Sequence, residues 1–352
     1  RRLAICVLNI FGFIIWLLFL IITPDKWWIG ILLRSLQGLI LGGNATVTPI
    51  IILEIAPNNS KGMFGGFAQI GKTTGFLIYY IVGTFSNWKA MVAIGAVFCL
   101  AESIFIWMTP EYDEINHFSV PENELGKEYL DQSLKKAKKC KCSCKHHKYE
   151  SVFQRRYAFN LFSGMMMMVF QQFSGINALN ANLTRIMTNC GLRIDSNLKS
   201  AISTTAQWLA VFVSSFILDA CGRKSIWILS ATGITVGLAM YSISLRIVID
   251  GWFPALCVFL IMIFFGFGYG PIPWFVGYEM FPQEVRMMGQ SMINFAAMMA
   301  TFAIAFINPI MDEKLGEFYV VITYMIITLV GVFFGIWFVK DPKEMDENIT
   351  IL

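Results

Sequence analysis

The sequence predicts an all-α membrane protein with ten transmembrane helices, on the basis of its composition, its long apolar runs and an internal repeat. Hydrophobic residues make up 56% of the 352 residues and charged residues only 14%, whereas a soluble domain carries about 25% charged residues. Runs of about twenty apolar residues are typical of membrane-spanning helices. Ten such runs occur, at residues 3–22, 29–53, 62–83, 89–109, 157–184, 200–218, 225–245, 254–278, 289–311 and 317–339.

Basic residues are distributed unevenly between the loops, and this predicts the orientation of the chain. If residues 1–2 are cytosolic and the spans alternate, 18 Lys and Arg residues lie on the cytosolic side, eight on the other side and Lys72 within a span. This asymmetry obeys the positive-inside rule. We therefore expect the loop 111–156, which carries most of the excess, and the C-terminus to be cytosolic. The net charge of +4 is too modest to indicate a nucleic-acid partner.

A short motif that follows a long apolar run occurs twice. Residues 54–61 read EIAPNNSK and residues 279–286 read EMFPQEVR, and both fit Glu-x-x-Pro-x-x-x-(Lys/Arg). The basic pairs RR (1–2) and RK (223–224) precede the two motifs at similar distances. Such repetition indicates an internal repeat. Because two spans precede the second basic pair and none precedes the first, we expect ten of twelve helices in two six-helix halves, with the first two lacking; a diverged ten-span protein is the alternative.

The repeat divides the chain into four parts. We expect an incomplete N-terminal bundle of four spans at 1–110 and a cytosolic linker with a surface helix at 111–156. A six-helix bundle at 157–340 and a short cytosolic tail at 341–352 follow.

No motif in the chain indicates enzymatic chemistry or a cofactor. There is no nucleotide-binding loop and no nucleophile–base pair, and the eight cysteines show no secreted disulfide framework. The linker segment CKCSCKHH (140–147) has ligand types that suit zinc, but its spacing fits no finger pattern. We therefore expect a solvated basic loop, no metal site, and a protein that is not an enzyme.

Several segments, in order along the chain, resemble the sugar porters of the major facilitator superfamily. EIAPNNSKG (54–62) resembles the turn after the family's fourth span, and QQFSGIN (171–177) resembles its seventh-span signature. DACGRK (219–224) resembles the loop between spans eight and nine, and GPIPWF (270–275) resembles span ten. The resemblance implies two six-helix bundles around a central cavity that opens alternately to opposite faces. It also implies transport of a hexose or related polyol, and we expect the plasma membrane as the location.

The resemblance further implies a set of substrate contacts. Sugars are neutral and rich in hydroxyl groups, so their site needs amides, which both donate and accept hydrogen bonds, and an aromatic face. The predicted contacts are Gln69, Gln171, Gln172, Asn177, Gln207 and Trp274. Hydrogen bonding between helices is the alternative for Gln171 and Gln172, and helix packing is the alternative for Trp274.

Charged residues at the matched turns are expected to form a cytosolic gate. Ion pairs between the two halves would hold this side closed and would break on opening, so they should be modest and partly hydrated. The predicted gate residues are Arg2, Glu54, Lys61, Asp219, Arg223, Glu279 and Arg286. Solvated turn charges without a gating role are the alternative.

The sequence departs from the family pattern at positions that bear on the substrate. The family's acid in span ten falls on Gly266, and the Asn-Trp pair of span eleven falls on Ala297 and Met298. Asn294, one turn earlier, is a candidate to replace the asparagine of this pair, and we therefore add it to the predicted substrate contacts. These differences put hexose specificity, though not transport, in doubt.

Lys72 is the largest departure, because a lysine within a span is costly and usually functional. It lies three residues after Gln69 and therefore shares a helix face with it. Three interpretations stay open. Lys72 is a cavity charge for an anionic or polyhydroxy-acid substrate, an ion-pair partner of Glu102 in the next span, or a packing residue whose ammonium reaches the membrane surface.

The sequence thus predicts a transporter for a hexose or related polyol that works by alternating access. The alternatives are a carrier for an anionic sugar or small organic acid, a nutrient sensor with a transporter fold, and an inactive gene fragment. The expected partners are the small-molecule substrate and the lipid bilayer. Proton coupling stays open because the family's coupling acid lies in its first span, and the oligomeric state is open as well.

Overall fold

A computed structural model describes most of the chain. The described residues are 2–22, 26–57, 60–109, 152–189, 195–247, 252–282 and 285–339. Regular structure within these ranges is helical, with no β-strand. The expected surface helix of the linker, the segment 140–147 and the tail 341–352 lie outside the described residues.

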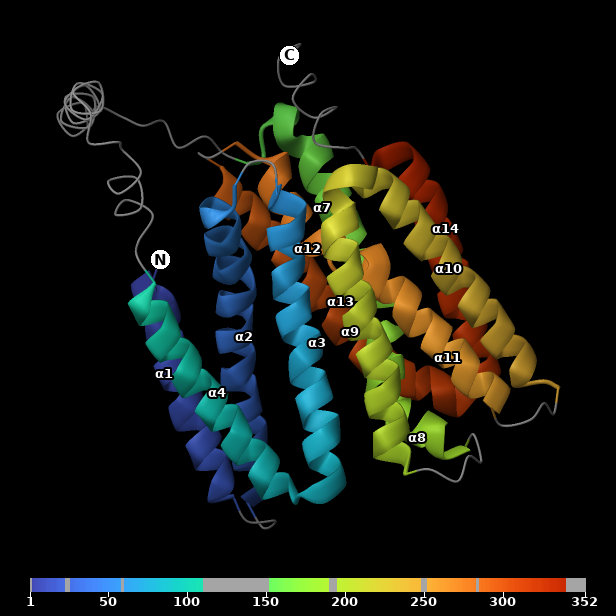
Figure 1. Cartoon of the computed structure of the whole chain (residues 1–352), viewed down its shortest axis with the longest axis horizontal. Helices are drawn as coiled ribbons and strands as arrows, with labels where there is room; N and C mark the ends of the chain where they lie inside the picture. Colours follow the sequence, from blue (N-terminus) through green and yellow to red (C-terminus); the bar gives the residue numbers. More distant parts are fainter. Residues whose placement is uncertain are drawn as a thin grey trace.

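Four helices form a first group, and each corresponds to one predicted apolar run. They are α1 (Arg2–Leu20), α2 (Trp27–Ile55), α3 (Lys61–Phe85) and α4 (Trp88–Met108). α1 packs along α4 at the outer side of the molecule, whereas α2 and α3 face the remaining helices (Figure 1).

The other six predicted spans form a second group, in which two spans are interrupted. Its continuous helices are α9 (Ser196–Cys221), α10 (Arg223–Ser244), α13 (Arg286–Leu315) and α14 (Glu317–Phe338). One interrupted span consists of α7 (Arg155–Phe173) and α8 (Ile176–Asn189). The other consists of α11 (Trp252–Phe264), a π-helical turn η3 (Phe265–Tyr269) and α12 (Ile272–Met280).

The break between α7 and α8 lies at Gly175, between Gln172 and Asn177. Gly175 adopts a φ of 80°, a left-handed conformation that glycine reaches without steric cost. A Cβ at this position would lie 2.3 Å from the Tyr324 ring. The chain therefore bends here, so that residues on either side of the break approach one another.

All ten predicted spans are helical in the structure. In the part of the chain that the structure describes, eight helices, with Trp252–Met280 counted as one, are long and apolar enough to cross a membrane. α3 and the α7–α8 pair complete the set. They are less apolar because they carry polar side chains such as Lys72, Gln171 and Asn177.

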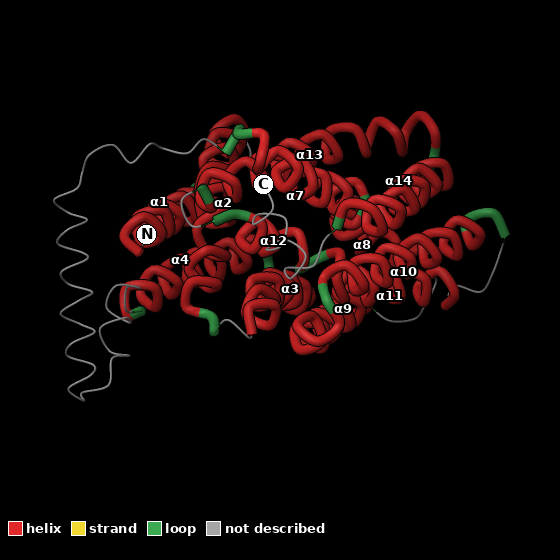
Figure 2. Tube along the Cα trace, turned by 90° about the horizontal axis from the view of Figure 1, so that it is seen from above, coloured by secondary structure: helices red, strands yellow, loops and turns green. Residues whose placement is uncertain are grey.

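The two groups meet chiefly along α3 and α9, with α2 adding contacts to α12 and α13 (Figure 2). Glycines let α3 approach closely, as small residues do at membrane helix interfaces. A Cβ at Gly65 would lie 2.6 Å from the Phe275 ring, and one at Gly66 would lie 2.1 Å from the Ser215 hydroxyl. α3 therefore presents one side to α12 and an adjacent side to α9.

The span from α11 to α12 is interrupted because Pro271 and Pro273 have no N–H to donate to the preceding turn. In a continuous helix, these two residues would donate to the carbonyls of Phe267 and Tyr269. Water does not reach the interior of a membrane, so these carbonyls must find donors within the protein.

Side chains from two neighbouring helices supply the missing donors. The Ser214 hydroxyl of α9 donates to Phe267 O. The Gln171 amide of α7 donates to Tyr269 O at 3.0 Å and to Gly270 O at 2.6 Å. The break is therefore fixed to α7 and α9.

A serine of α10 inserts into the helical ladder just before this point. Ser230 Oγ accepts from Tyr269 N at 2.9 Å and donates to Phe264 O at 2.5 Å. The N–H of Gly270 consequently bonds to Phe265 O at 2.8 Å, which is the π-helical pattern of η3. Insertion of a side chain into the ladder is a common cause of such local changes.

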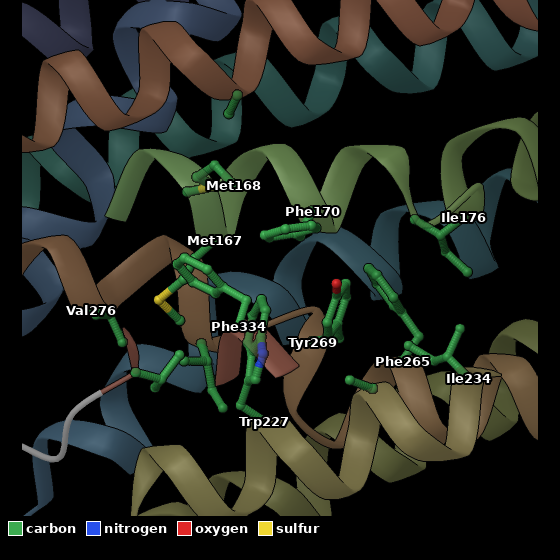
Figure 3. Close-up of a cluster of buried hydrophobic side chains, with 14 of the residues drawn as sticks. Met167, Met168, Phe170, Ile176, Trp227, Ile234, Phe265, Tyr269, Val276 and Phe334 are labelled. Carbon is green, nitrogen blue, oxygen red and sulfur yellow. The ribbon is translucent and has the colours of Figure 1, made fainter. Parts of the chain in front are cut away.

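The apolar core of the second group surrounds this break (Figure 3). Trp227 of α10 stacks on Tyr269 with ring centroids 4.2 Å apart, and its indole donates to Gly331 O at 3.1 Å. Phe170 and Phe334 pack in the same cluster, with ring centroids 5.1 Å apart. Packing on all sides of Tyr269 fixes the direction in which α12 begins.

Replacing Ser230 with alanine should lower the melting temperature. The change removes the bonds of Ser230 Oγ to the buried Tyr269 N–H and Phe264 O, and a buried polar group that loses its partner costs about 1–3 kcal/mol. Thermal unfolding of the purified protein in detergent measures the effect. Thr232→Ala on the same helix is the control, since it removes only an exposed hydroxyl bonded to Ile228 O. Equal melting temperatures for the two variants would contradict the role of Ser230.

Candidate functional site

Two of the predicted substrate residues lie on one side of α3. Gly65, Gln69 and Lys72 are spaced by four and three residues, which places them on one helix face, and Gly65 shows that this face points to α12. The Gln69 side chain is only 3% exposed. Lys72 stays exposed, and its ammonium lies over the Trp274 ring, 5.4 Å from the centroid. Residues of both groups therefore meet here.

The predicted amides of α7 and α8 form a connected network. Gln172 donates to Gln171 Oε1 at 2.9 Å, and Asn177 donates to Gln172 Oε1 across the break between the helices. Thr301 of α13 donates to the same oxygen at 3.0 Å. In the described part of the chain, the second N–H of Gln172 and Asn177 Oδ1 make no hydrogen bond, so both are available to a ligand.

Gln171 has a different environment from Gln172, although the two residues are adjacent. Both of its N–H groups donate to the interrupted span, to Tyr269 O and Gly270 O, and its oxygen accepts from Gln172. These contacts correspond to the alternative interpretation, hydrogen bonding between helices. In this conformation Gln171 fixes α7 to the segment that precedes Trp274.

Gln207 of α9 and Trp274 of α12 each hold a buried polar atom without a partner. Gln207 is 1% exposed, and neither its Oε1 nor Trp274 Nε1 makes a hydrogen bond within the described residues. An unsatisfied buried group costs about 1–3 kcal/mol, so both atoms are candidates for contact with a bound molecule. Next to Gln207, a Cβ at Gly266 would lie 2.6 Å from Gln207 O. The structure therefore has no room for the family's acid at this position.

Asn294 connects the two groups and offers no free amide. Its Nδ2 donates to Ala45 O at 2.9 Å and to Thr46 Oγ1 at 3.1 Å, both on α2. Its Oδ1 accepts from Gln290, which also donates to Trp274 O. In this conformation Asn294 holds α13 against α2 and supports Trp274.

Four polar residues around the site were absent from the sequence interpretation. They are Ser214, Ser230, Gln290 and Thr301. Their signal in the sequence was a polar side chain within an apolar run, where a partner is needed. That signal does not identify the partner.

A cluster of charges at one end of the molecule joins the two groups. Arg223, only 7% exposed, donates to Glu279 at 2.9 and 3.2 Å and to Asp219 at 3.0 Å. Asp219 also accepts from the backbone N–H groups of Gly62 and Met63, at 2.9 and 3.0 Å. These N–H groups start α3, where helical partners are lacking and the dipole favours an anion. A single carboxylate therefore links α9 to α3; we call these five residues the gate cluster.

Two of the predicted gate residues, Arg2 and Arg286, make contacts only within their own groups in this conformation of the described residues. Arg2 donates to Thr109 O at 3.1 Å within the first group. Arg286 donates to Phe281 O at 3.1 Å and lies 4.0 Å from the Tyr278 ring centroid within the second group. Carbonyls at the ends of helices lack helical partners, and they bind these guanidinium groups locally.

Lys61 and Glu54 lie at the same end of the molecule as the gate cluster. Lys61 is the first residue of α3, and its positive charge acts on Glu279. Glu54 lies in the last turn of α2. α2 and α12, which carry the two repeated motifs at their ends, finish on the same side of the molecule (Figure 1).

Lys72 and Glu102 do not form the ion pair that the sequence allowed. The ion pairs within the described residues do not include these two side chains. Glu102 belongs to α4, which packs mainly on α1, whereas Lys72 reaches Trp274 in the second group. The helices therefore direct the two charges to different places.

Further contacts join α3 to the second group away from the gate cluster. Trp208 donates its indole N–H to Thr74 Oγ1 at 2.8 Å, and the Tyr80 hydroxyl donates to Asn180 O at 2.9 Å. α3 is therefore connected to the second group along most of its length.

Comparison with known sequences identifies the family of the chain. The family model described as "Sugar (and other) transporter" matches residues 1–346. The chain belongs to this family. Sugar transporter ERD6-like 7 of Arabidopsis thaliana is 26% identical over 338 residues, which cover 88% of this chain and 70% of the relative. Facilitated trehalose transporter Tret1 of Bombyx mori is 23% identical over 343 residues, which cover 90% and 68% of the two chains.

Solved structures of similar shape show the fold of the major facilitator superfamily. The proton:xylose symporter XylE of E. coli, bound to 6-bromo-6-deoxy-D-glucose, matches with a TM-score of 0.79 at 19% identity. The match covers 99% of this chain and 83% of XylE. As a member of the sugar transporter family, the protein is a multi-pass integral membrane protein and not an enzyme.

Replacing Asp219 with alanine should open the end of the transporter that holds the gate cluster. The change removes the acceptor of two backbone N–H groups of α3, whereas asparagine keeps one acceptor oxygen and should have a smaller effect. Spin labels at Ile55→Cys and at the native Cys221, both exposed positions, should move apart in the order wild type, asparagine, alanine. Electron paramagnetic resonance in a background without other cysteines measures the distances.

Asp312→Ala is the matched control for this experiment. Asp312 pairs with Arg185 at 3.7 Å, and both residues belong to the second group. Identical distance distributions for Asp219→Ala and Asp312→Ala would exclude a gating role for Asp219.

Proposed function

We propose that the protein carries a hexose or related polyol across a membrane by alternating access of its two helix groups. The observation that carries the proposal is the set of side-chain atoms with unused hydrogen-bonding capacity on Gln172, Asn177, Gln207 and Trp274. Hydroxyl groups both donate and accept, so a polyol can satisfy amide and indole groups alike. Relatives named as sugar and trehalose transporters support this substrate class.

In this proposal the residues with available atoms contact the substrate. Gln172 and Asn177 offer a donor and an acceptor at the break between α7 and α8. Gln69 and Gln207 contribute amides from α3 and α9, and Trp274 offers its ring face to the C–H groups of a sugar. The residues with saturated hydrogen bonds, Gln171 and Asn294, would hold the surrounding helices in place.

The gate cluster would close one side of the transporter. Opening that side requires Asp219 to leave the N-terminus of α3, whereas the pair between Arg223 and Glu279 lies within the second group and can persist. Hydrogen bonds to a charged group contribute about 1.5–3 kcal/mol each. Such energies are small enough to be exchanged for contacts at the opposite end. The distribution of basic residues supports a cytosolic location for the gate cluster, and we propose the plasma membrane as the location.

Uptake into proteoliposomes tests the proposed function. The wild-type protein should take up labelled glucose or a hexitol with saturable kinetics. Gln172→Ala and Trp274→Ala should each reduce uptake about two- to tenfold, because a neutral hydrogen bond contributes about 0.5–1.5 kcal/mol. Gln154→Ala is the control, since Gln154 lies exposed in the turn before α7.

The outcome that rejects the proposal is the absence of saturable uptake for every hexose, pentose and polyol by a folded, reconstituted wild-type protein. Equal uptake by Gln172→Ala, Trp274→Ala and Gln154→Ala would keep transport but reject the assigned site. Repeating the wild-type measurement with a pH gradient shows whether transport is coupled to protons.

A further inference from the structure

We infer that Lys72 and Trp274 bind a carboxylate, so that the preferred substrate is a sugar acid such as a hexuronate or an aldonate. This inference rests on the proposed transport function and names the substrate class of the same site. It concerns the part of the site that α3 and α12 form together.

The first argument is the position of the Lys72 ammonium. It lies over the Trp274 ring, 5.4 Å from the centroid, and therefore between the two helix groups. Within the described residues, Lys72 has neither an ion pair nor a hydrogen bond. A charged side chain within a membrane span is costly and usually functional. An anionic substrate would compensate this charge in the transport cycle.

The second argument is the chemistry of the unsatisfied atoms near Lys72. Trp274 Nε1–H is a donor without an acceptor, and it belongs to the ring over which the ammonium lies. A carboxylate only accepts hydrogen bonds, so it matches an ammonium and an indole N–H together. One of its oxygens can accept from the ammonium in a charge-assisted hydrogen bond, and the other can accept from the neutral indole N–H. Gln207 Oε1, an unsatisfied acceptor on α9, is left for a hydroxyl of the same molecule.

The third argument is that neighbouring acids would not repel an anion here. The acid that the family carries in the α11–α12 span is Gly266 in this chain, and the contact with Gln207 O leaves no room for a side chain. The carboxylates of Asp219 and Glu279 lie at helix ends and are bonded to Arg223.

The charge balance selects a carboxylate over a phosphate. One ammonium compensates the single negative charge of a sugar acid. A phosphate monoester carries about −1.5 to −2 charges at neutral pH, so Lys72 alone would leave part of its charge uncompensated between the helices. Sugar phosphates should therefore be poor substrates.

The test compares uptake of labelled D-glucuronate and D-glucose by the full chain in proteoliposomes. The ratio of glucuronate to glucose uptake should fall about tenfold or more in Lys72→Met, because a hydrogen bond to a charged group contributes about 1.5–3 kcal/mol. Lys72→Arg keeps the charge and should retain most of the ratio. Trp274→Phe keeps an aromatic ring but loses the N–H, and it should lower the ratio by a smaller factor.

Lys89→Met is the matched control variant. Lys89 also lies over a tryptophan ring, 5.8 Å from the centroid of Trp88, but at the start of α4. Its removal should leave the uptake ratio at the wild-type value. Glucose 6-phosphate, added as a competitor, should inhibit glucuronate uptake less than unlabelled glucuronate does.

The possible results separate this inference from the proposed function. Saturable glucose uptake without glucuronate uptake, or an unchanged ratio in Lys72→Met, would overturn the inference and leave sugar transport intact. Stronger inhibition by glucose 6-phosphate than by glucuronate would overturn the choice of a carboxylate. Uptake of neither substrate class would overturn the proposed function itself.

If Lys72→Met does not fold, thermal stabilisation of the detergent-solubilised wild type provides the test. Glucuronate should raise the melting temperature of the protein more than glucose does. An equal or smaller effect of glucuronate would overturn the inference.

Discussion

Inside a membrane every backbone carbonyl needs a donor from within the protein, and the span that contains Pro271 and Pro273 cannot meet this requirement alone. Gln171, Ser214 and Ser230 supply the missing partners from three different helices. The interrupted span is therefore held by α7, α9 and α10 together. The position of the Trp274 ring, and with it the shape of the candidate site, follows from these bonds.

α3 is the counterpart of that span in the first group. Its glycines allow close packing on α9 and α12, and its polar residues then reach the second group at the level of Trp274. The same helix begins at the gate cluster through Gly62 and Met63. One rigid element thus connects the candidate site to the contact that closes one end. A movement of α3 would alter both, which is the coupling that alternating access requires.

Much of the fold was predictable from the sequence, because the length of an apolar run and the spacing of a motif are local properties. The roles of individual polar residues were less predictable. Gln171 and Gln172 are identical neighbours, yet one satisfies backbone carbonyls and the other retains a free N–H, a difference that arises from surrounding helices. The sequence placed Lys72 and Glu102 in consecutive spans and so allowed an ion pair, but it does not determine the direction in which each helix face points. Arg286 donates to Phe281 O, a carbonyl close to it in the sequence, and not to an acid of the other group.

The two helices joined by the hydrogen bonds of Asp219 differ in how well they tolerate mutation at the bonded positions. On the α3 side the donors are main-chain N–H groups, so nearly any residue at position 63 still supplies one, with proline as the exception. Position 62 is restricted by space, since a Cβ on Gly62 would lie 2.4 Å from Asp219 Oδ1. On the α9 side, both acceptor oxygens belong to one side chain, so replacing Asp219 with a residue such as alanine, valine or glycine removes them together. We therefore expect natural substitutions that weaken or strengthen this closure to occur at Asp219 and its neighbours on α9. At the beginning of α3, the side chain at position 63 can vary, whereas Gly62 should be kept.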